Sequence, residues 1–286
     1  MSCTIAVLLT CHNRNEKTLS CLQSVYQQDV DAEVILKIFL VDDGSTDGTA
    51  EAVKKKYPEI NIVAGDGNLF WAGGMRKAWN AALSSGIALD YFLLLNDDTV
   101  LYNYTISNLL ADFKKLANPR VILSSPTIDS VSNDVSYGGS LLTSSKKSQF
   151  KMLEPNGHSP QLCDLANANI MLVPFNVYQT IGILSAKYTH GIADFDYTLT
   201  AKKNGILTYI ASNYGGVCSN DHGKNWRSGK EYNLKQRINY LYSPTGLAYK
   251  EYIYYIKKHF PKEYVEAVVK IWTKTLFPYI YDRLKK

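Results

Sequence analysis

The sequence has few cysteines and no long hydrophobic run, and each shortage excludes a class of protein. Its 5 cysteines are scattered over 286 residues without a Cys-x-x-Cys pair, so we expect free thiols in a reducing cytoplasm and no structural zinc site. The longest apolar stretches are about five residues, whereas a membrane-spanning helix needs about 18. Residues 1–4 carry no basic flank before the first apolar run, so we expect no secretion signal.

Two phosphate-binding signatures are also absent. The chain has no Gly-x-Gly-x-x-Gly, which disfavours a dinucleotide-dependent dehydrogenase. It has no Gly-x-x-x-x-Gly-Lys-Ser/Thr either, which disfavours a P-loop NTPase. If the chain handles a nucleotide, it does so with a different set of residues.

The composition is that of a folded protein with an uneven charge. Apolar residues make up 46% and charged residues 20%, enough for a sizeable core in one large domain or slightly more. Residues 224–286 hold 14 Lys/Arg and 5 Asp/Glu, so the basic charge is concentrated there. This balance favours an anionic partner, such as a membrane surface, a phosphorylated substrate or a nucleic acid. A solvated helix face is the alternative.

Strands and helices alternate over the first 100 residues or so. Apolar runs predict strands over 4–10, 34–41, 61–64 and 91–95. Helical spacing from Leu19 to Tyr26 predicts a helix, and further helices are expected over 50–56 and 75–85, with a glycine-rich loop over 65–74. This alternation is typical of an α/β fold with a mainly parallel, Rossmann-like sheet flanked by helices.

The rest of the chain is less regular. Residues 124–160 are rich in Ser, Asn, Gly and Pro and predict loops and hairpins, and apolar strands are expected at 169–173 and 206–210. From about 231 the pattern turns helical, with 12 aromatic residues among positions 240–286. We therefore predict one domain over 1–230, with halves at about 1–100 and 101–230, and a helical, basic, aromatic-rich extension over 231–286.

Polar clusters follow three of the predicted strands. They are residues 10–14, Asp42 with Asp43, and 96–98. Ligands of parallel sheets bind beyond the carboxyl ends of the strands, so these clusters predict a shared site. Carboxylates on a rigid turn suit Mg²⁺ or Mn²⁺ held together with substrate phosphates, and a buried Asp can accept hydrogen bonds from a base or ribose. Helix capping is the alternative for 42–47.

The motifs at these positions resemble those of family 2 glycosyltransferases, which have the GT-A fold. The resemblance rests on Thr-Cys-His-Asn-Arg at 10–14, Val-Asp-Asp-Gly-Ser-Thr-Asp-Gly-Thr at 41–49 and Leu-Asn-Asp-Asp-Thr at 95–99, and it covers about residues 4–240. The loop Gly-Asn-Leu-Phe-Trp-Ala-Gly-Gly at 67–74 resembles that of the rhamnosyltransferase-like branch. The fold implied is GT-A with a helical C-terminal extension.

The resemblance implies a binding site for a nucleotide-sugar donor. Asp98 stands where the family has its metal ligand, bridging Mn²⁺ or Mg²⁺ to the diphosphate. His222 lies in a late His motif, which implies either a metal ligand or a contact with the diphosphate. Asn96 departs from the family's Asp-x-Asp motif and adds no charge. The residues implied in donor binding are Thr10, His12, Asn13, Arg14, Asp42, Asp43, Asn68, Trp71, Gly74, Asn96, Asp97 and Arg237.

The segment 190–196 resembles the stretch that carries the family's catalytic base. Asp194 aligns with that base and Asp196 is the second candidate, while Ala193 stands where Glu is usual. Capping of the following helix is the alternative role for these acids.

Together these features predict an inverting, metal-dependent glycosyltransferase. The donor would be a UDP-sugar or dTDP-rhamnose, and the acceptor a hydroxyl of a glycan or lipid-linked molecule in bacterial surface polysaccharide synthesis. We expect a cytoplasmic protein that contacts the inner face of the membrane through its C-terminal segment and binds no nucleic acid; a homodimer is left open. An inert sugar-binding or scaffold subunit is one alternative. A sugar-phosphate nucleotidyltransferase is another, although Cys-His-Asn at 11–13 replaces the glycine-rich loop it would need.

Overall fold

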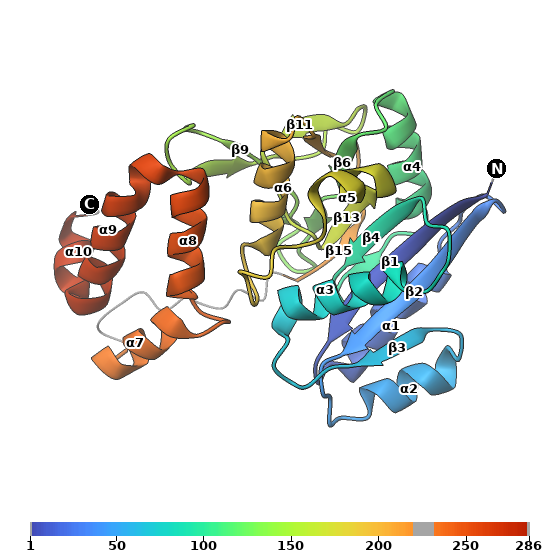
Figure 1. The fold of residues 1–286 in the computed structure, drawn as a ribbon, viewed down its shortest axis with the longest axis horizontal. Coiled ribbons are helices and arrows are strands. Elements are labelled where there is room, and N and C mark those ends of the chain that lie inside the picture. Colours follow the sequence, from blue (N-terminus) through green and yellow to red (C-terminus); the bar gives the residue numbers. More distant parts are fainter. Residues whose placement is uncertain (1, 220–231, 285–286) are drawn as a thin grey trace.

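A computed structural model describes residues 2–219 and 232–284 of the chain (Figure 1). Its centre is an eight-stranded sheet in the order β11-β14-β6-β13-β4-β1-β2-β3. β13 runs antiparallel to β4 and β6, and β11 runs antiparallel to β14, while the other pairs are parallel, so the predicted mainly parallel sheet is confirmed. Its strands are β1 (Cys3–Cys11), β2 (Val34–Asp42), β3 (Asn61–Ala64), β4 (Tyr91–Leu95), β6 (Val121–Ser124), β11 (Gln161–Cys163), β13 (Ile170–Pro174) and β14 (Leu207–Ile210).

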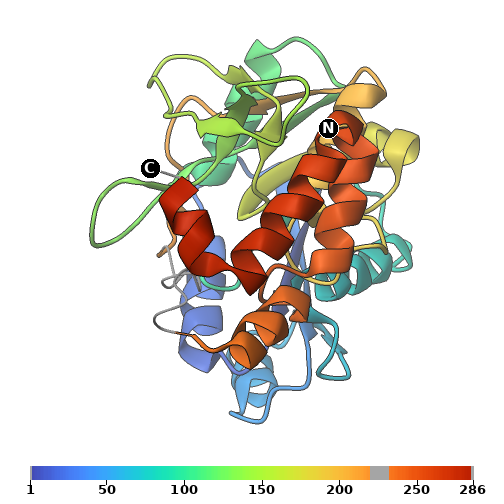
Figure 2. The same cartoon turned by 90° about the vertical axis from the view of Figure 1, so that its left-hand side faces the viewer.

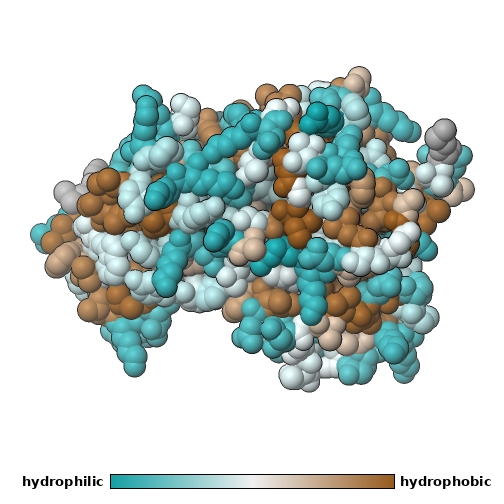
Figure 3. Space-filling model, viewed as in Figure 1, coloured by the Kyte–Doolittle hydropathy of each residue, from teal (hydrophilic) through white to brown (hydrophobic). Residues whose placement is uncertain are grey.

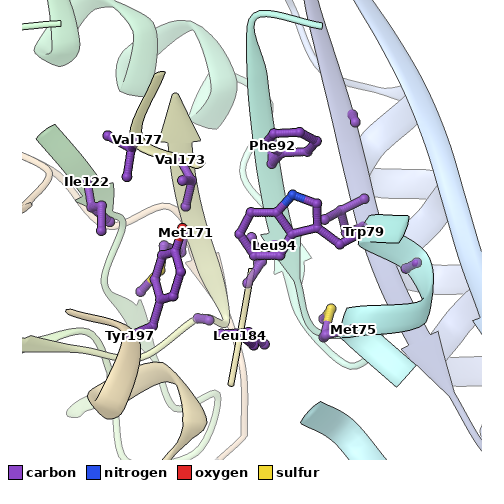
Figure 4. Close-up of a cluster of buried hydrophobic side chains, with 14 of the residues drawn as sticks. Met75, Trp79, Phe92, Leu94, Ile122, Met171, Val173, Val177, Leu184 and Tyr197 are labelled. Atoms are coloured by element: carbon purple, nitrogen blue, oxygen red, sulfur yellow. The ribbon is translucent and has the colours of Figure 1, made fainter. Parts of the chain in front are cut away.

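Alternating side chains of the central strands feed two separate cores. In β1, Ile5 and Val7 join a core with α1, α2 and α4, whereas Ala6 and Leu8 join a core with α3, α5 and α6. Figure 4 shows the second core, where Trp79 of α3 packs beside β4. The helices are α1 (Asn15–Tyr26), α2 (Thr49–Lys56), α3 (Phe70–Leu83), α4 (Thr105–Lys115), α5 (Phe175–Ile181) and α6 (Ala193–Lys203).

Two small sheets accompany the large one. Some of their strands fall within residues 124–160, where loops and hairpins were expected, and the others lie outside that range. One has the order β10-β9-β12 and the other β5-β15-β7-β8. The first contains β9 (Gly139–Leu142), β10 (Phe150–Met152) and β12 (Leu165–Ala166). The second contains β5 (Val100–Leu101), β7 (Thr127–Ile128), β8 (Val135–Tyr137) and β15 (Gly216–Val217).

Helix α3 begins at Phe70, five residues before the predicted start at Met75. The prediction was wrong because glycine normally weakens a helix. Here a Cβ at Gly74 would lie only 2.0 Å from Thr10 Oγ1, so glycine allows the helix to approach the end of β1 closely. Gly74, one of the glycines that suggested a loop, is needed for this packing.

The C-terminal helices form one end of the molecule and stand in front of the sheet in Figure 2. They are α7 (Leu234–Tyr242), α8 (Tyr249–His259), the 3-10 helix η1 (Pro261–Glu263), α9 (Tyr264–Leu276) and α10 (Pro278–Leu284). Tyr255 and Ile256 of α8 pack with Ala193 and Leu199 of α6 in a third core. Within the described residues, no helix has both the length and the apolar character to cross a bilayer.

Candidate functional site

The three polar clusters meet at one edge of the sheet because β1, β2 and β4 are adjacent and parallel. In the register of β1 and β2, Cys11 pairs with Asp42, so both strands end at the same level. Arg14, just after β1, reaches the turn after β4 and donates hydrogen bonds to Asp98 Oδ2 at 2.6 Å and Asp97 Oδ1 at 3.3 Å. The three polar clusters, residues 10–14, Asp42 with Asp43, and 96–98, therefore lie together, and we call them the strand-end cluster.

The loop after β1 is joined to the loop after β2. His12 Nδ1 lies 2.6 Å from the carbonyl oxygen of Asp43. The Asn13 side-chain oxygen accepts a hydrogen bond from the Thr46 N–H at 2.7 Å, and its backbone N–H donates to Ser45 Oγ at 2.9 Å. Asn13 has a φ of 51°, a left-handed conformation that Asn tolerates better than most residues.

The two aspartates after β2 have different environments. Both oxygens of Asp43 accept backbone N–H groups, from Gly67 at 2.9 Å and from Leu69 and Phe70 at 2.9 and 3.1 Å, so its carboxylate caps the first turn of α3. Asp42 accepts one hydrogen bond through Oδ1, from the Ser45 N–H at 2.9 Å. Among the described residues no donor reaches its second oxygen, which makes Asp42 the better placed of the two to contact a base or ribose.

Two aspartates of residues 42–47 cap helices, and each caps a different helix. Asp47 Oδ1 accepts the N–H of Thr49 at 3.1 Å at the start of α2. Asp43, by contrast, caps the more distant α3.

Trp71, in the first turn of α3, contacts the turn after β4. Its indole Nε1 donates to Asn96 Oδ1 at 2.7 Å. Trp71 thus occupies one acceptor position of the Asn96 side-chain oxygen, and among the described residues the amide NH₂ makes no hydrogen bond. Gly74 lies against Thr10 on the next turn of the helix. Asn68 is exposed and bonds to Asp66 rather than to the strand-end cluster.

Asp97 is buried and lies against Arg14 and Thr18. Burial raises the pKa of its carboxyl to about 7; Asp98 adds to the rise and Arg14 opposes it. Asp98 is more open to solvent and lies 3.6 Å from Cys218 Sγ, a contact that the sequence did not suggest. Asp98 is thus the more accessible carboxylate of the pair.

The described residues supply little of a metal site by themselves. Residues 2–219 and 232–284 hold no group of three or more His, Cys, Asp or Glu side chains placed to bind a metal. Asp98 offers one carboxylate ligand, so a Mg²⁺ or Mn²⁺ ion bound there would take most of its other ligands from phosphate oxygens and water. His222, the late His of the sequence motif, lies outside the described residues.

Asp194 lies in the first turn of α6 and is linked to the same edge of the sheet. Its Oδ2 accepts hydrogen bonds from the Ala168 N–H at 3.2 Å and the Asn167 side chain at 3.3 Å, and Oδ1 accepts the Phe195 N–H at 2.8 Å. The next residue along, Asn169, accepts the backbone N–H of Asn96 through its carbonyl at 3.1 Å. Desolvation raises the pKa of the Asp194 carboxyl despite these bonds, which suits a group that takes up a proton.

Asp196 and Arg237 bond elsewhere. Asp196 is buried and its carboxylate bonds to the Lys258 ammonium, the His259 ring and the Tyr188 hydroxyl. Arg237 is also buried, and its guanidinium donates to the backbone carbonyls of Thr275 and Tyr232. Within the described part of the chain, neither side chain makes a hydrogen bond to the strand-end cluster.

A solved structure shares this architecture. The fold matches the structure of the mannosyltransferase PcManGT from Pyrobaculum calidifontis in complex with GDP-Man and Mn²⁺, with a TM-score of 0.57. The two chains are 14% identical, and the match covers 99% of this chain and 79% of the other. The chain has the GT-A glycosyltransferase fold, with a helical C-terminal part, as expected.

The sequence assigns the chain to a family. Residues 6–161 match the model of glycosyl transferase family 2, so the chain belongs to that family. No curated protein matches the sequence. The family resemblance is confirmed, whereas the rhamnosyltransferase-like branch stays a prediction.

Proposed function

We propose that the protein is an inverting glycosyltransferase with a nucleotide-diphosphate sugar as donor and a hydroxyl of a glycan or lipid-linked molecule as acceptor. A UDP-sugar or dTDP-rhamnose would be the donor, and bacterial surface polysaccharide synthesis the setting. The observation that carries the proposal is the meeting of three strand-end clusters at one edge, with Asp194 linked to that edge through Ala168 and Asn169. Membership of glycosyl transferase family 2 supports the reaction class.

The donor would lie across the ends of β1, β2 and β4. The second oxygen of Asp42 would accept a hydrogen bond from the base or ribose, and the NH₂ of Asn96 would donate to a ribose or phosphate oxygen. Arg14 would contact the diphosphate, because a guanidinium pairs well with phosphate oxygens. Asp43 would act indirectly by holding the 67–70 backbone, and Trp71 would form a wall of the pocket.

A divalent cation, Mn²⁺ or Mg²⁺, would be held by Asp98 and the diphosphate and would offset the charge of the leaving group. The chemistry of the donor set supports this, since a carboxylate and phosphate oxygens are the ligands these ions prefer. Arg14 occupies Asp98 Oδ2 in this structure, so it would turn from the carboxylate toward the phosphates on donor binding.

Asp194 would act as the general base. Its carboxylate would take the proton of the acceptor hydroxyl while that oxygen forms a bond to the anomeric carbon. The bond from the anomeric carbon to the diphosphate oxygen breaks at the opposite face, which inverts the configuration. The raised pKa of Asp194 brings the carboxylate closer to the basicity this step needs.

Donor consumption tests the proposal without knowledge of the acceptor, because water can serve as a poor acceptor. UDP-, GDP-, CDP- and dTDP-sugars are incubated with the protein and Mn²⁺, and release of the nucleoside diphosphate is followed with and without EDTA. We expect release from one donor class, lost with EDTA. Binding without any release would support the inert sugar-binding alternative, which the departures at Asn96 and Ala193 favour. Formation of a nucleoside triphosphate and a sugar phosphate, only when pyrophosphate is added, would instead indicate a nucleotidyltransferase.

The proposed contact with the membrane surface is made by the C-terminal helices. Of the 21 large hydrophobic side chains exposed in the described residues, seven lie between Tyr264 and Ile280, and Figure 3 shows hydrophobic side chains gathered at that end. Val265, Val269 and Leu276 recur at spacings of four and seven residues and so share one edge of α9. The surplus of Lys and Arg in 224–286 complements anionic lipid headgroups. Lys258, however, bonds to Asp196 and is not part of this surface.

Vesicle flotation tests this contact. We expect the protein to float with vesicles containing anionic phospholipid, and a Val265→Glu/Val269→Glu variant to lose about tenfold or more of that binding, since each buried CH₂ contributes about 0.8 kcal/mol. The control is Val131→Glu, at a valine that is 88% exposed in a different part of the molecule. Equal flotation of all three proteins would remove the membrane contact. Loss of self-association in the double variant, without any flotation of the wild type, would assign the surface to a homodimer.

A further inference from the structure

Helix α8 contacts the segment that carries Asp194 on both sides of it. Glu251, in the first turn of α8, accepts hydrogen bonds from the backbone N–H of Thr189 at 2.9 Å and from its hydroxyl at 2.5 Å. Lys258, in the last turn, bonds to both oxygens of Asp196 at 2.8 and 2.9 Å. The proposed base lies between these two anchor points in the sequence.

The two anchors lie on the same face of α8. Glu251 and Lys258 are seven residues apart, which is two helical turns and about 10 Å. Further contacts strengthen the C-terminal anchor. The His259 ring lies 2.7 Å from Asp196, Lys258 also donates to Thr200 Oγ1 at 2.9 Å, and Lys203 donates to the Lys258 carbonyl at 2.7 Å. Helix α8 thus lies along residues 189–203 and is hydrogen-bonded to both ends of this segment.

The segment between the anchors has an unfavourable backbone. Ile192 has a φ of 67°, which is costly for a β-branched residue, and it precedes the first residue of α6. A conformation of this kind persists only when surrounding contacts impose it. Arg76 of α3 adds to these contacts by donating to the carbonyls of Ser185 and Tyr188 at 3.1 and 2.8 Å.

The surroundings of Asp196 make it unsuited to accept a proton from a substrate. Its carboxylate is saturated by Lys258, His259 and the Tyr188 hydroxyl, the last at 2.8 Å. Burial alone would raise the pKa of this carboxyl, but the three hydrogen bonds hold it below its usual value. Asp194, two residues earlier, is bonded only to neutral amide groups among the described residues.

We infer that α8 is a positioning element for the general base: through Glu251, Lys258 and Asp196 it fixes the turn at Ile192 and with it the orientation of the Asp194 carboxylate. The inference rests on the proposed function, because it presupposes that Asp194 is the base. It assigns Asp196 a positioning role, and it makes the C-terminal helices part of the active enzyme.

The test compares two neighbouring lysines of α8 in the full chain. Lys258→Met removes the anchor, whereas Lys257→Met changes an exposed lysine with no anchor contact among the described residues and serves as the control. A displacement of about 1 Å at a catalytic group can lower the reaction rate by about 10²-fold. We therefore expect Lys258→Met to lower kcat of donor hydrolysis by about 10- to 100-fold. We expect its Kd for the nucleoside diphosphate to stay within about twofold, since the strand-end cluster is untouched. Lys258→Arg should restore most of kcat.

A second variant and a second readout guard against simple loss of folding. Glu251→Gln keeps one acceptor for Thr189 and should lower kcat more mildly at an unchanged Kd. In the wild type, the Asp196 N–H donates to the Ile192 carbonyl at 2.8 Å. In Lys258→Met, amide hydrogen exchange should accelerate in residues 193–196 because this turn is held less firmly.

The outcomes separate the inference from the proposed function. A wild-type protein that turns over donor, with Lys258→Met and Glu251→Gln as active as Lys257→Met, would overturn the positioning role alone. A parallel loss of kcat and donor affinity would also overturn it, because it would indicate general disruption. Absence of donor binding and turnover in the wild type would overturn the proposed function, and the role of α8 with it.

Discussion

The strand-end edge and the C-terminal helices use charge in opposite ways. At the strand ends, charged groups are gathered but left incompletely paired: Asp42 keeps an oxygen that no described donor reaches, and Asp98 is partly open to solvent. Against the C-terminal helices, Asp196 is saturated by Lys258, His259 and Tyr188. The incompletely paired groups are available for a ligand, whereas the saturated group holds helices together.

The contrast is sharpest within a single turn of α6. Asp194 and Asp196 are two residues apart, yet the pKa of one is raised and that of the other is lowered. The difference comes from their partners, since one faces neutral amides and the other a lysine, a histidine and a tyrosine. A carboxylate that is costly to ionise is suited to take a proton, and one stabilised in its ionised form is suited to hold a structure.

The largest expected effect is that of Asp194→Asn on turnover. Loss of a general base typically lowers the rate by about 10²- to 10⁴-fold, or about 3–5 kcal/mol of barrier. Donor binding should persist, because Asp194 is not among the donor-binding residues. Donor hydrolysis measures the first quantity and calorimetric titration with the nucleoside diphosphate the second. Normal turnover in Asp194→Asn would contradict its role as base.

Next in size is the stability difference between Asp194→Asn and Asp196→Asn. The lowered pKa of Asp196 means that its ionised form contributes stability above its unfolded pKa, and that this stability is lost as pH falls through the folded pKa. Asp196→Asn should therefore destabilise at pH 7 by about 3 kcal/mol, the scale of a broken buried pair. The difference from wild type should shrink in acid.

Asp194→Asn should change the free energy of unfolding in the opposite direction. The raised pKa of Asp194 means that its ionised form costs stability at neutral pH, and that this cost fades as pH falls and the folded protein takes up the proton. We expect the melting temperature of Asp194→Asn at pH 7 to equal or exceed that of the wild type. Thermal unfolding of both variants at pH 7 and at about pH 3, below the unfolded Asp pKa of about 3.9, measures these signs. A lower melting temperature for Asp194→Asn than for Asp196→Asn at pH 7 would contradict the contrast.

A smaller effect is expected for Asp98→Ala. Loss of a charged contact of about 1.5–3 kcal/mol should weaken metal-dependent binding of the nucleoside diphosphate by about 10- to 100-fold. Binding measured in EDTA should change much less, because Asp98 would contact the diphosphate through the cation. An unchanged response to Mn²⁺ and Mg²⁺ would remove Asp98 from the metal site.

The smallest effect is expected for Trp71→Phe. This change removes the hydrogen bond from the indole to Asn96 while keeping an aromatic wall. Loss of about 1 kcal/mol predicts a roughly fivefold rise in donor Kd, with kcat changed less. Titration of wild type and variant with the same donor measures it. A larger loss in kcat than in affinity would place Trp71 closer to the reacting atoms than the account holds.

The first 100 residues could be predicted well from sequence because their signals are local. The strands at 61–64 and 91–95 have the predicted bounds, and the polar clusters follow strands whose apolar runs fix where each ends. Once those strands lie parallel and adjacent, the clusters must meet. The start of α3 was missed because the need for Gly74 comes from Thr10, 64 positions away in the chain.

The contacts of α6 with α8 could not be predicted for the same reason. Asp196 bonds to Lys258 across 62 positions, and in sequence it is simply a second acid in a helical first turn, like Asp194. Likewise, Lys258 and Lys257 read as one basic pair, although one points to Asp196 and the other to solvent. Local patterns locate the chemistry, but only the packed structure shows which charges are already paired.

The most direct test of the account is a thermal-shift panel of UDP, dTDP, GDP and CDP, each with Mn²⁺, Mg²⁺ or EDTA. A ligand at about 100 times its Kd adds about 2.7 kcal/mol to the free energy of unfolding, which corresponds to a shift of several degrees. We predict that UDP or dTDP stabilises the protein with metal present, that EDTA abolishes most of the shift, and that Asp98→Ala does the same. No shift with any of the four nucleotides would contradict a nucleotide-sugar site at the ends of β1, β2 and β4.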